Sequence, residues 1–270
     1  NLPRIDYTDG CGSLLLEPQS TNLYLNSDTL VTQSNATSAS AYTVSFYGTG
    51  TITFSGTHTG TLVGTGLNDR VSVTFTATSG TLISTISGSC TKGQLENLTY
   101  PTSYIPTQGV ISTRLKDIAT NSSNASLINS EEGVLYAEIS ALADEATTKS
   151  ISINSGSSTN VVRISFFSNV ILARIVSPSG TTSNLTYTVP SINDFYKVAF
   201  KYNATLNNHA LYVNGALRFT STQVIDLGSS LTTLSFADGN AGGNFYGKTK
   251  ALAVFKTALT DEQLTLLTTI

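Results

Sequence analysis

The stretch VVRISFFSNVILARIV, residues 161–176, decides the fold. It contains two runs of strand length, Val161–Phe167 and Val170–Val176, in which most residues are apolar. Such runs are typical of strands that are buried between two sheets. The stretch therefore favours an all-β protein with packed sheets around its core.

The rest of the second half continues this pattern and ends in a helix. Asn214-Gly215 predicts a tight hairpin, because a type I′ turn needs positive φ at both positions. Thr260-Asp261-Glu262-Gln263 fits a capping box with Thr260 as the N-cap, so a short C-terminal helix should dock on a β-sandwich. Further strands are expected at Gly133–Ala141, Phe195–Tyr202, Ala210–Val213, Leu231–Phe236 and Lys248–Phe255.

In the first half, short strands alternate with glycine-rich turns. Between residues 42 and 47, Tyr42, Val44 and Phe46 alternate with hydroxyl-bearing residues, and residues 71–76 repeat the pattern. A period of two predicts one apolar face toward a core and one hydroxyl-rich face toward solvent. The first half is therefore also expected to be a β-sandwich.

Composition supports this class and excludes others. Ser and Thr together occupy 77 of the 270 positions, and Thr favours strands while Ser and Gly favour turns. A net charge of −3 excludes a basic nucleic-acid binder. The sequence also contains no run of about 18 apolar residues of the kind that spans a membrane. No signal peptide is visible, and the absence of Met suggests a fragment or a processed chain.

The cysteines and histidines carry no recognisable chemistry. Cys11 and Cys90 are expected to be buried free thiols, with a disulfide between them as the alternative. His58 and His209 lack the partners of a zinc site or a nucleophile and are expected to be surface histidines of a loop or strand.

No catalytic residue is predicted, and the chain is expected not to be an enzyme. A β-sandwich glycosidase needs two carboxyl groups about 5–9.5 Å apart. The Glu-x-Asp-x-x-Glu pattern that would supply them is absent, and Glu131, Glu132, Asp144 and Glu145 look like solvated charges. Glu138 with Asp238 or Asp194 is the only pairing that an enzyme could use.

The best candidate for binding is the loop ADGNAGGNFY, residues 237–246, between two expected strands. Asp238, Asn240 and Asn244 could bind sugar hydroxyls or a Ca²⁺ ion, and Tyr246 could stack on a sugar face. The alternative is a long glycine-rich hairpin loop without a ligand. The absence of Trp weakens the case for tight stacking on a saccharide.

Two sets of motifs in the first 117 residues resemble a family of bacteriophage virion proteins. The opening set is PRIDY at Pro3–Tyr7 and LLLEPQSTNL at Leu14–Leu23. The closing set is GQLE at Gly93–Glu96, PTSYIPT at Pro101–Thr107, and Thr113-Arg114. In relatives these segments bracket a jelly roll similar to carbohydrate-binding modules, so the resemblance implies such a domain at residues 1–117.

Residues 127–270 resemble a concanavalin A-like, laminin-G-like jelly roll. The resemblance is carried by YVNG at Tyr212–Gly215 and LAVFKTALTDEQL at Leu252–Leu264. The expected architecture is thus two tandem jelly-roll β-sandwiches with a short C-terminal helix, joined by a polar linker at residues 118–126.

The two motif sets on one chain imply a phage tail-fibre or receptor-binding protein. The expected function is non-catalytic adhesion to host surface polysaccharide, on a virion fibre that is a homo-oligomer, with a trimer favoured. The alternatives are a structural or decoration protein that packs against other virion subunits, or a polysaccharide depolymerase.

Overall fold

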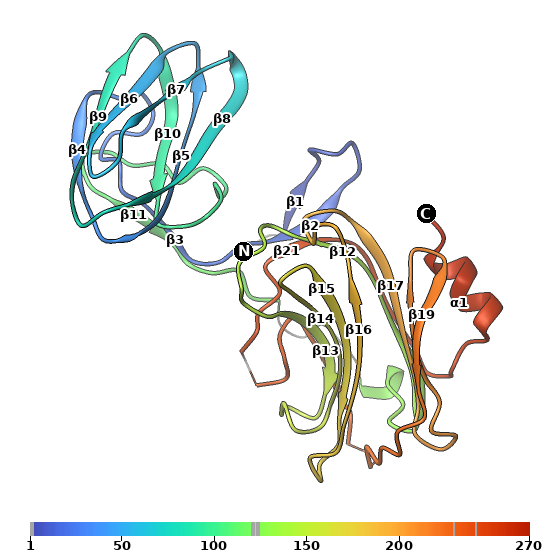
Figure 1. Cartoon of the computed structure of the whole chain (residues 1–270). Helices are drawn as coiled ribbons and strands as arrows, with labels where there is room; N and C mark the ends of the chain where they lie inside the picture. The colour runs from blue at the N-terminus through green and yellow to red at the C-terminus, as the bar shows by residue number, and fades with distance from the viewer. Residues whose placement is uncertain (1–2, 120–121, 123–124, 229, 241) are drawn as a thin grey trace. The chain divides into compact units, whose positions relative to one another are not determined.

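The computed structural model describes residues 3–119, 122, 125–228, 230–240 and 242–270. These residues form strands, one 3₁₀ turn and one α-helix, which confirms the all-β prediction with its C-terminal helix (Figure 1). They divide into two compact units. One unit is residues 17–117, and the other combines residues 3–16 with the described part of 118–270.

The smaller unit, residues 17–117, is a β-sandwich. Its first sheet has the order β10 (Cys90–Glu96), β5 (Ser40–Gly48), β8 (Gly66–Ala77). Its second sheet has the order β4 (Gln33–Thr37), β9 (Gly80–Ser87), β6 (Thr51–Gly56), β7 (Gly60–Val63). A two-stranded ladder pairs β3 (Ser20–Asn22) with β11 (Ser112–Arg114).

The apolar face of β5 lies in the core of this sandwich, as its alternation predicts. Tyr42, Val44 and Phe46 are buried. The opposite face was expected to be solvated, and here the prediction is wrong, because Thr43 and Ser45 are fully buried as well. The Thr43 hydroxyl bonds to the Leu98 carbonyl oxygen at 2.9 Å, so the segment after β10 covers this face.

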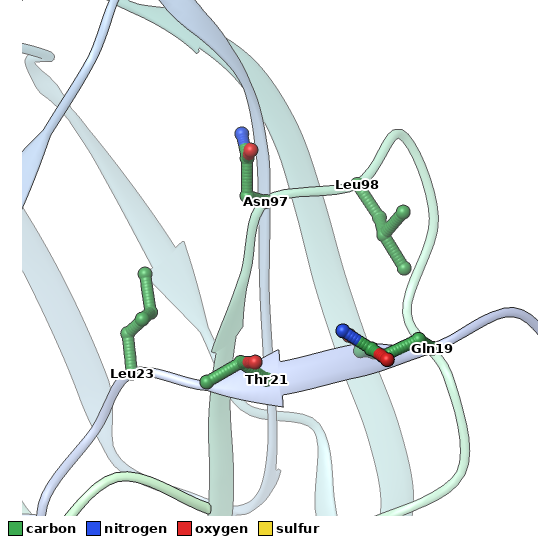
Figure 2. A pocket seen from close by; sticks show the side chains of 6 residues that line it. Gln19, Thr21, Leu23, Asn97 and Leu98 are labelled. Carbon is green, nitrogen blue, oxygen red and sulfur yellow. The ribbon is translucent and has the colours of Figure 1, made fainter. Parts of the chain in front are cut away.

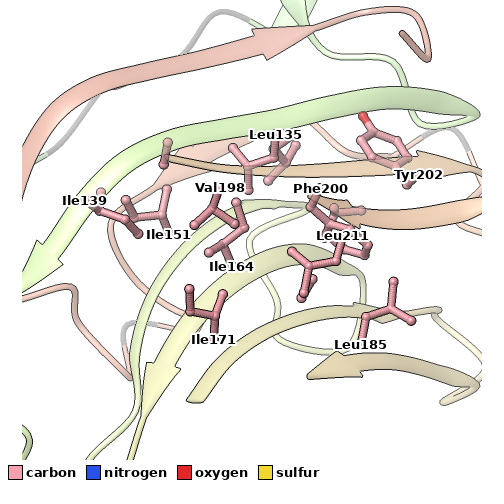
Figure 3. Close-up of a cluster of buried hydrophobic side chains, with 14 of the residues drawn as sticks. Leu135, Ile139, Ile151, Ile164, Ile171, Leu185, Val198, Phe200, Tyr202 and Leu211 are labelled. Carbon is pink, nitrogen blue, oxygen red and sulfur yellow. The ribbon is translucent and has the colours of Figure 1, made fainter. Parts of the chain in front are cut away.

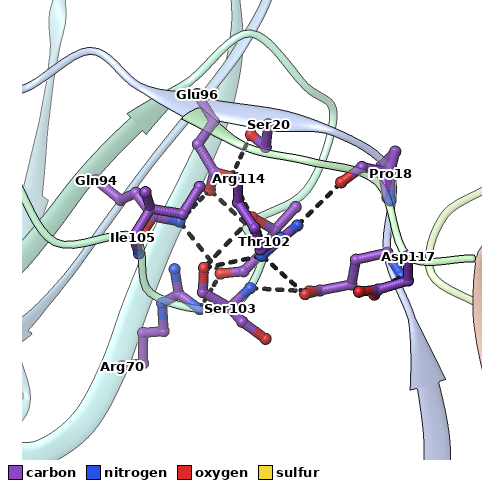
Figure 4. A network of polar contacts seen from close by, with 11 residues as sticks. Pro18, Ser20, Arg70, Gln94, Glu96, Thr102, Ser103, Ile105, Arg114 and Asp117 are labelled. Atoms are coloured by element: carbon purple, nitrogen blue, oxygen red, sulfur yellow. Dashed lines mark hydrogen bonds and ion pairs between the residues drawn. The ribbon is translucent and has the colours of Figure 1, made fainter. Parts of the chain in front are cut away.

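A buried carboxylate, Glu96, fastens that covering segment (Figure 4). Its oxygens accept hydrogen bonds from Ser20 Oγ at 2.7 Å, Gln94 Nε2 at 2.6 Å, and both the backbone N–H (3.0 Å) and the hydroxyl of Thr102. Gln94 Oε1 in turn accepts from the Ile105 backbone N–H at 2.5 Å. The segments around Ser20, Gln94 and Thr102 are thus bound to one another by buried polar contacts.

Glu17 and Arg114 continue this network. They form an ion pair at 2.9 Å, and Arg114 also donates to the Pro18 carbonyl oxygen at 3.0 Å. Glu17 Oε1 accepts from the Ser103 backbone N–H at 2.8 Å. The first and last segments of the unit are therefore held by charge-assisted hydrogen bonds, which are the stronger kind.

The larger unit packs two sheets face to face. The seven-stranded sheet has the order β1 (Arg4–Asp6), β2 (Ser13–Leu16), β21 (Gly247–Phe255), β12 (Glu132–Ala141), β17 (Tyr196–Asn203), β18 (His209–Val213), β19 (Ala216–Ser221). The five-stranded sheet has the order β16 (Thr182–Thr188), β15 (Val170–Val176), β14 (Val161–Phe167), β13 (Lys149–Asn154), β20 (Thr233–Ser235).

The main core lies between these two sheets (Figure 3). Leu135 and Phe200 reach it from the seven-stranded sheet, while Ile151, Ile164 and Ile171 reach it from the five-stranded sheet, and all five side chains are fully buried. Strands β14 and β15 match the predicted runs residue for residue. Because every second residue of these strands faces the core, the remaining ones are directed to the outer face.

The predicted division into residues 1–117 and 127–270 is wrong at its first end. Strand β2 pairs with β21, so the β1–β2 hairpin belongs to the larger sheet. Two ion pairs hold this hairpin to β21, Asp6 with Lys248 at 2.8 Å and Asp9 with Lys250 at 2.6 Å. The smaller sandwich is therefore an insertion in the larger one, and the two are not tandem domains.

The predicted linker at residues 118–126 falls partly outside the described residues, because positions 120, 121, 123 and 124 are not described. A 3₁₀ turn, η1, spans Ala125–Leu127. At the four undescribed positions the linker stays a prediction.

The local predictions for the C-terminal part are confirmed. Helix α1 (Asp261–Thr268) begins at a capping box in which Thr260 accepts from the Gln263 backbone N–H and the Gln263 side chain accepts from the Thr260 N–H. Asn214 and Gly215 both have positive φ, at 49° and 75°. The helix packs its Leu264 on the outer face of the seven-stranded sheet.

Both cysteines are free, but only Cys90 is buried, so the expectation of two buried thiols is wrong for Cys11. Among the described residues, no helix has the length and apolar character to cross a bilayer.

His209 is fully buried, which corrects its prediction as a surface residue. Its Nδ1 accepts from the Asn203 backbone N–H at 3.3 Å, so Nε2 carries the proton and donates to the Gln223 carbonyl oxygen at 3.1 Å. Burial lowers the pKa of His209 from its ordinary 6.5, and the hydrogen bond to Gln223 opposes this shift only in part.

The buried acceptor Glu96 should be essential for the stability of the smaller unit. Glu96→Ala leaves several buried donors without an acceptor, and we expect a loss of at least about 3 kcal/mol in the free energy of unfolding. Hydrogen exchange of the Thr102 and Ile105 amides measures it. The control is Asp69→Ala, an exposed carboxylate of the same unit, which should cost less than about 0.5 kcal/mol. Equal exchange in the two variants would contradict the assignment.

The stability of β17 and β18 should depend on pH through His209. The unfolded chain takes up this proton near pH 6.5 and the folded chain only at lower pH, so the unfolded state binds more protons in between. We expect protection of the β17 and β18 amides to fall as the pH drops from 7.5 to 5.5. In His209→Gln this decline should be much smaller. An identical decline in both proteins would show that other groups cause it.

Candidate functional site

The loop between β20 and β21 contains the predicted binding residues. Asp238 Oδ1 accepts from the backbone N–H of Asn240 at 2.9 Å and of Gly242 at 3.2 Å. The Asp238 backbone N–H also donates to the Gly242 carbonyl oxygen at 2.9 Å. Asp238 therefore shapes the loop itself, while the Asn240 side chain is exposed.

This loop is fixed to the five-stranded sheet. The Ser150 backbone N–H donates to the Gly243 carbonyl oxygen at 2.8 Å, and Ser152 Oγ donates to the Ala237 carbonyl oxygen at 2.7 Å. Phe245 is buried, with its ring centroid 6.3 Å from that of Phe166 in the core. The loop is thus ordered by the sandwich, and little conformational entropy would be lost when it binds a ligand.

The other two predicted residues lie at the end of this loop. Asn244 forms a parallel bridge with Ser150, and the backbone N–H of Tyr246 donates to the Asn244 carbonyl oxygen at 3.0 Å. Asn244 and Tyr246 are both half-buried. The structure brings the four predicted residues into one loop, and stacking of Tyr246 on a sugar stays a prediction.

Sequence reasoning missed a row of polar side chains beside this loop. One residue from each strand of the five-stranded sheet lies in direct cross-strand register. The row runs Ser235 (β20), Ser152 (β13), Arg163 (β14), Arg174 (β15), Asn184 (β16). Their neighbours along each strand face the core, so these five residues, here called the polar row, lie on the outer face.

The two ends of the polar row differ. At one end Ser152 and Ser235 lie 3.1 Å apart through their hydroxyls, and both bond to Asn154 Nδ2 at 3.0 Å. Ser152 is fully buried, in contact with the loop. At the other end Asn184 and Thr186 are exposed. One end of the row is therefore closed by the loop, and the other is open to solvent.

The two arginines in the middle of the row are half-buried and face each other across neighbouring strands. Within the part of the chain that the structure describes, neither guanidinium forms a hydrogen bond or an ion pair, and both Nε atoms are shielded from solvent. A buried donor without a partner costs about 1–3 kcal/mol, and like charges directly opposite on two strands are destabilising. The folded state thus tolerates an unfavourable arrangement at this point.

The electrostatics of the row agree with this geometry. Burial lowers the pKa of Arg163, and the positive charge of Arg174 lowers it further. The negative charge of the Asp238 carboxylate acts to raise the pKa of Arg163, although the two side chains do not form an ion pair. A positive potential is therefore concentrated at the centre of the row.

A sequence signal for these arginines exists. Arg163 and Arg174 each interrupt an apolar run, Arg163 directly before the core residue Ile164 and Arg174 directly after the core residue Ala173. A charged residue at the same phase in two adjacent strands indicates a shared polar face. The hydrophobicity of the two runs alone predicts buried strands and does not reveal this polar face.

Glu138 and Asp238, one of the two carboxylate pairs that an enzyme could use, lie on different faces of the larger unit. Glu138 lies between the core residues Ala137 and Ile139, so it is on the outer face of the seven-stranded sheet. The loop with Asp238 lies on the outer face of the other sheet, and the core separates the two. The described residues also contain no group of three His, Cys, Asp or Glu side chains that could hold a metal, and Ca²⁺ binding by the loop stays a prediction.

The smaller unit has a pocket of about 160 Å³ over β3 (Figure 2). It is lined by alternate residues of one segment, Gln19, Thr21 and Leu23, and by Asn97 and Leu98. The Asn97 amide already donates to Ser40 Oγ at 3.0 Å and to the Ala41 carbonyl oxygen at 2.8 Å. Ligand pockets usually enclose about 300–1,000 Å³, so this pocket is the weaker candidate.

Comparison with known proteins gives similarities of fold. No family model matches the sequence, and no curated protein matches it. The CBM40 module of the Ruminococcus gnavus IT-sialidase, solved with α2,3 sialyllactose, is 16% identical with a TM-score of 0.46, over 54% of this chain and 85% of that chain.

Two other solved structures are similar to the same degree. A heptameric SAP-like pentraxin from Limulus polyphemus is 15% identical with a TM-score of 0.41, over 52% of this chain and 70% of that chain. The receptor-binding domain of botulinum neurotoxin type G is 12% identical with a TM-score of 0.41, over 50% of this chain and 37% of that chain. The sheets of the two units themselves define the class of the chain as an all-β sandwich protein.

The role of Asp238 in shaping its loop can be separated from its charge. Asp238→Ala removes the acceptor for two backbone N–H groups, and we expect about 1 kcal/mol of lost stability and faster exchange of the Asn240 and Gly242 amides. Asp238→Asn keeps an acceptor oxygen and should retain most of that protection. Equal exchange in both variants would contradict the role of the Oδ1 hydrogen bonds.

Proposed function

We propose that the chain is a non-catalytic glycan-binding module that uses the outer face of the five-stranded sheet. The binding surface extends from the loop with Asp238 across the two arginines to Asn184 and Thr186. The polar row carries this proposal, since five side chains from five strands lie in register beside a loop that the sheet already orders.

The chemistry of this face suits a sugar. Saccharide hydroxyls both donate and accept, and the face offers the Asp238 carboxylate, the Asn184 amide, the Thr186 hydroxyl and two guanidinium groups. Each hydrogen bond between neutral groups contributes only about 0.5–1.5 kcal/mol, so one site should bind weakly. Useful avidity then requires several copies of the chain.

The resemblance of the motifs near the N-terminus to phage virion proteins extends the proposal. It assigns the chain to a tail fibre or surface fibre of a virion, assembled as a homo-oligomer and most simply as a trimer. The ligand is then a surface polysaccharide of the host cell, and Asn240, Asn244 and Tyr246 add contacts from the loop. The support for this part is the pairing of the opening and closing motifs on one chain.

Binding to glycans should depend on the open end of the polar row. Asn184→Ala with Thr186→Ala removes two exposed polar groups beside Arg174, and we expect at least a fivefold loss of binding on an array of bacterial surface glycans. The thermal midpoint should not change, because both side chains are exposed.

The matched control is Thr205→Ala with Asn208→Ala, two exposed side chains between β17 and β18, which should bind like the unsubstituted chain. Absence of binding to every glycan would overturn the proposal in favour of a structural virion protein. Release of reducing sugar ends from a bound polysaccharide would overturn its non-catalytic part.

A further inference from the structure

Arg163 and Arg174 differ from three lysines of the larger unit, which are paired with acidic side chains. Lys248, Lys250 and Lys201 each form an ion pair with an aspartate, at 2.6–2.8 Å. Arg163 and Arg174 are cross-strand partners, and among the described residues no carboxylate pairs with either. Two adjacent positive charges are therefore left on one patch of the sheet.

The patch is also partly desolvated. Both Nε atoms are shielded from water and have no acceptor, while each arginine as a residue is only half-buried. A guanidinium presents its donors in a planar fork that matches a carboxylate, and it is less strongly hydrated than an ammonium group. Two guanidinium groups side by side therefore form a site that fits a planar anion.

The surroundings limit where an anion could lie. Asp238 carries a negative charge that acts on Arg163, so the side of the patch near the loop repels a second anion. On the opposite side, Asn184 is the cross-strand partner of Arg174, and both Asn184 and Thr186 are exposed. Neutral hydrogen-bonding groups therefore border the arginines where the face is open.

We propose that Arg163 and Arg174 together bind the carboxylate of an acidic sugar, while Asn184 and Thr186 bind its hydroxyls. This inference rests on the proposed glycan-binding function and specifies the ligand class for the same face. The carboxylate would supply the acceptor that both guanidinium groups lack and would neutralise their mutual repulsion. Asp238 would then orient the sugar ring by accepting from a hydroxyl group.

The test uses the full chain and a matched pair of ligands. Oligogalacturonate carries one carboxylate on each sugar, and its methyl ester has the same sugars without the charge. We expect titration calorimetry to show at least tenfold tighter binding of the acid than of the ester. The preference should shrink as salt is raised, because added ions screen the charges.

The variants Arg163→Gln and Arg174→Gln should each reduce binding of the acid at least tenfold and reduce binding of the ester by a clearly smaller factor. Arg163→Lys should not restore affinity, since an ammonium group lacks the fork. The control is Arg218→Gln, which removes the same charge from an arginine that lies over the Tyr187 ring at 4.4 Å. This control should bind the acid within about twofold of the unsubstituted chain.

A ligand-free measurement adds an independent readout. The thermal midpoint of Arg174→Gln should equal or exceed that of the unsubstituted chain, because the substitution removes a repulsion and no bond. Sodium glucuronate should raise the midpoint of the unsubstituted chain and not that of the variant that combines Arg163→Gln with Arg174→Gln. If sodium sulfate raises it equally, the patch is a general anion site and the carboxylate assignment is overturned.

The outcomes separate this inference from the function on which it rests. Equal binding of acid and ester, lost in the Asn184 and Thr186 double variant, would retain the glycan-binding module and overturn the acidic ligand. Unchanged binding of the acid in both arginine variants would overturn it as well. Failure of every neutral and acidic glycan to bind would overturn both proposals.

Discussion

The strands of the five-stranded sheet must bury every second residue in the core, and most features of the larger unit depend on this alternation. Ile164 and Ala173 are fully buried, so the backbone carries Arg163 and Arg174 to the opposite face. A shift of the register by one residue would place both charges in the core, at prohibitive cost. The hydrophobic core and the positive patch are thus two consequences of one register.

The abundance of hydroxyl side chains has a structural meaning in both sandwiches. Some of these groups form cross-strand pairs, among them Thr43 with the exposed Thr74 at 2.7 Å and the buried Ser150 with the buried Ser165 at 2.8 Å. A Ser or Thr hydroxyl both donates and accepts, so two of them satisfy each other on neighbouring strands. A polar face of a sheet can then be covered by another segment of the chain. The segment after β10, which is hydrogen-bonded to Glu96, covers the polar face of β5 in this way.

The sequence was sufficient wherever the signal is local. The capping box at Thr260, the turn at Asn214-Gly215 and the runs that became β14 and β15 depend on residues close in the chain, and all are confirmed. Strands β13 and β16 were not predicted, because they are rich in hydroxyl side chains and are ordered by their neighbours in the sheet. For the candidate site, the loop around Asp238 could be located, but the polar row depends on register between four pairs of strands. The pairing of β2 with β21 also joins distant parts of the chain, so no local signal could assign residues 3–16 to the larger unit.

The insertion of the smaller sandwich has a consequence for how the larger one assembles. The backbone N–H of Glu17 donates to Asp117 Oδ2 at 2.7 Å, and the Asp117 N–H donates to the Glu17 carbonyl oxygen at 2.9 Å, so the two ends of the inserted unit meet. The inserted unit can therefore complete its own contacts as soon as residue 117 has left the ribosome. The edge of the seven-stranded sheet must wait for β21, more than 230 residues after β2. Until then β2 has no partner on that side, and early closure of the insert shortens the effective loop that separates the two strands.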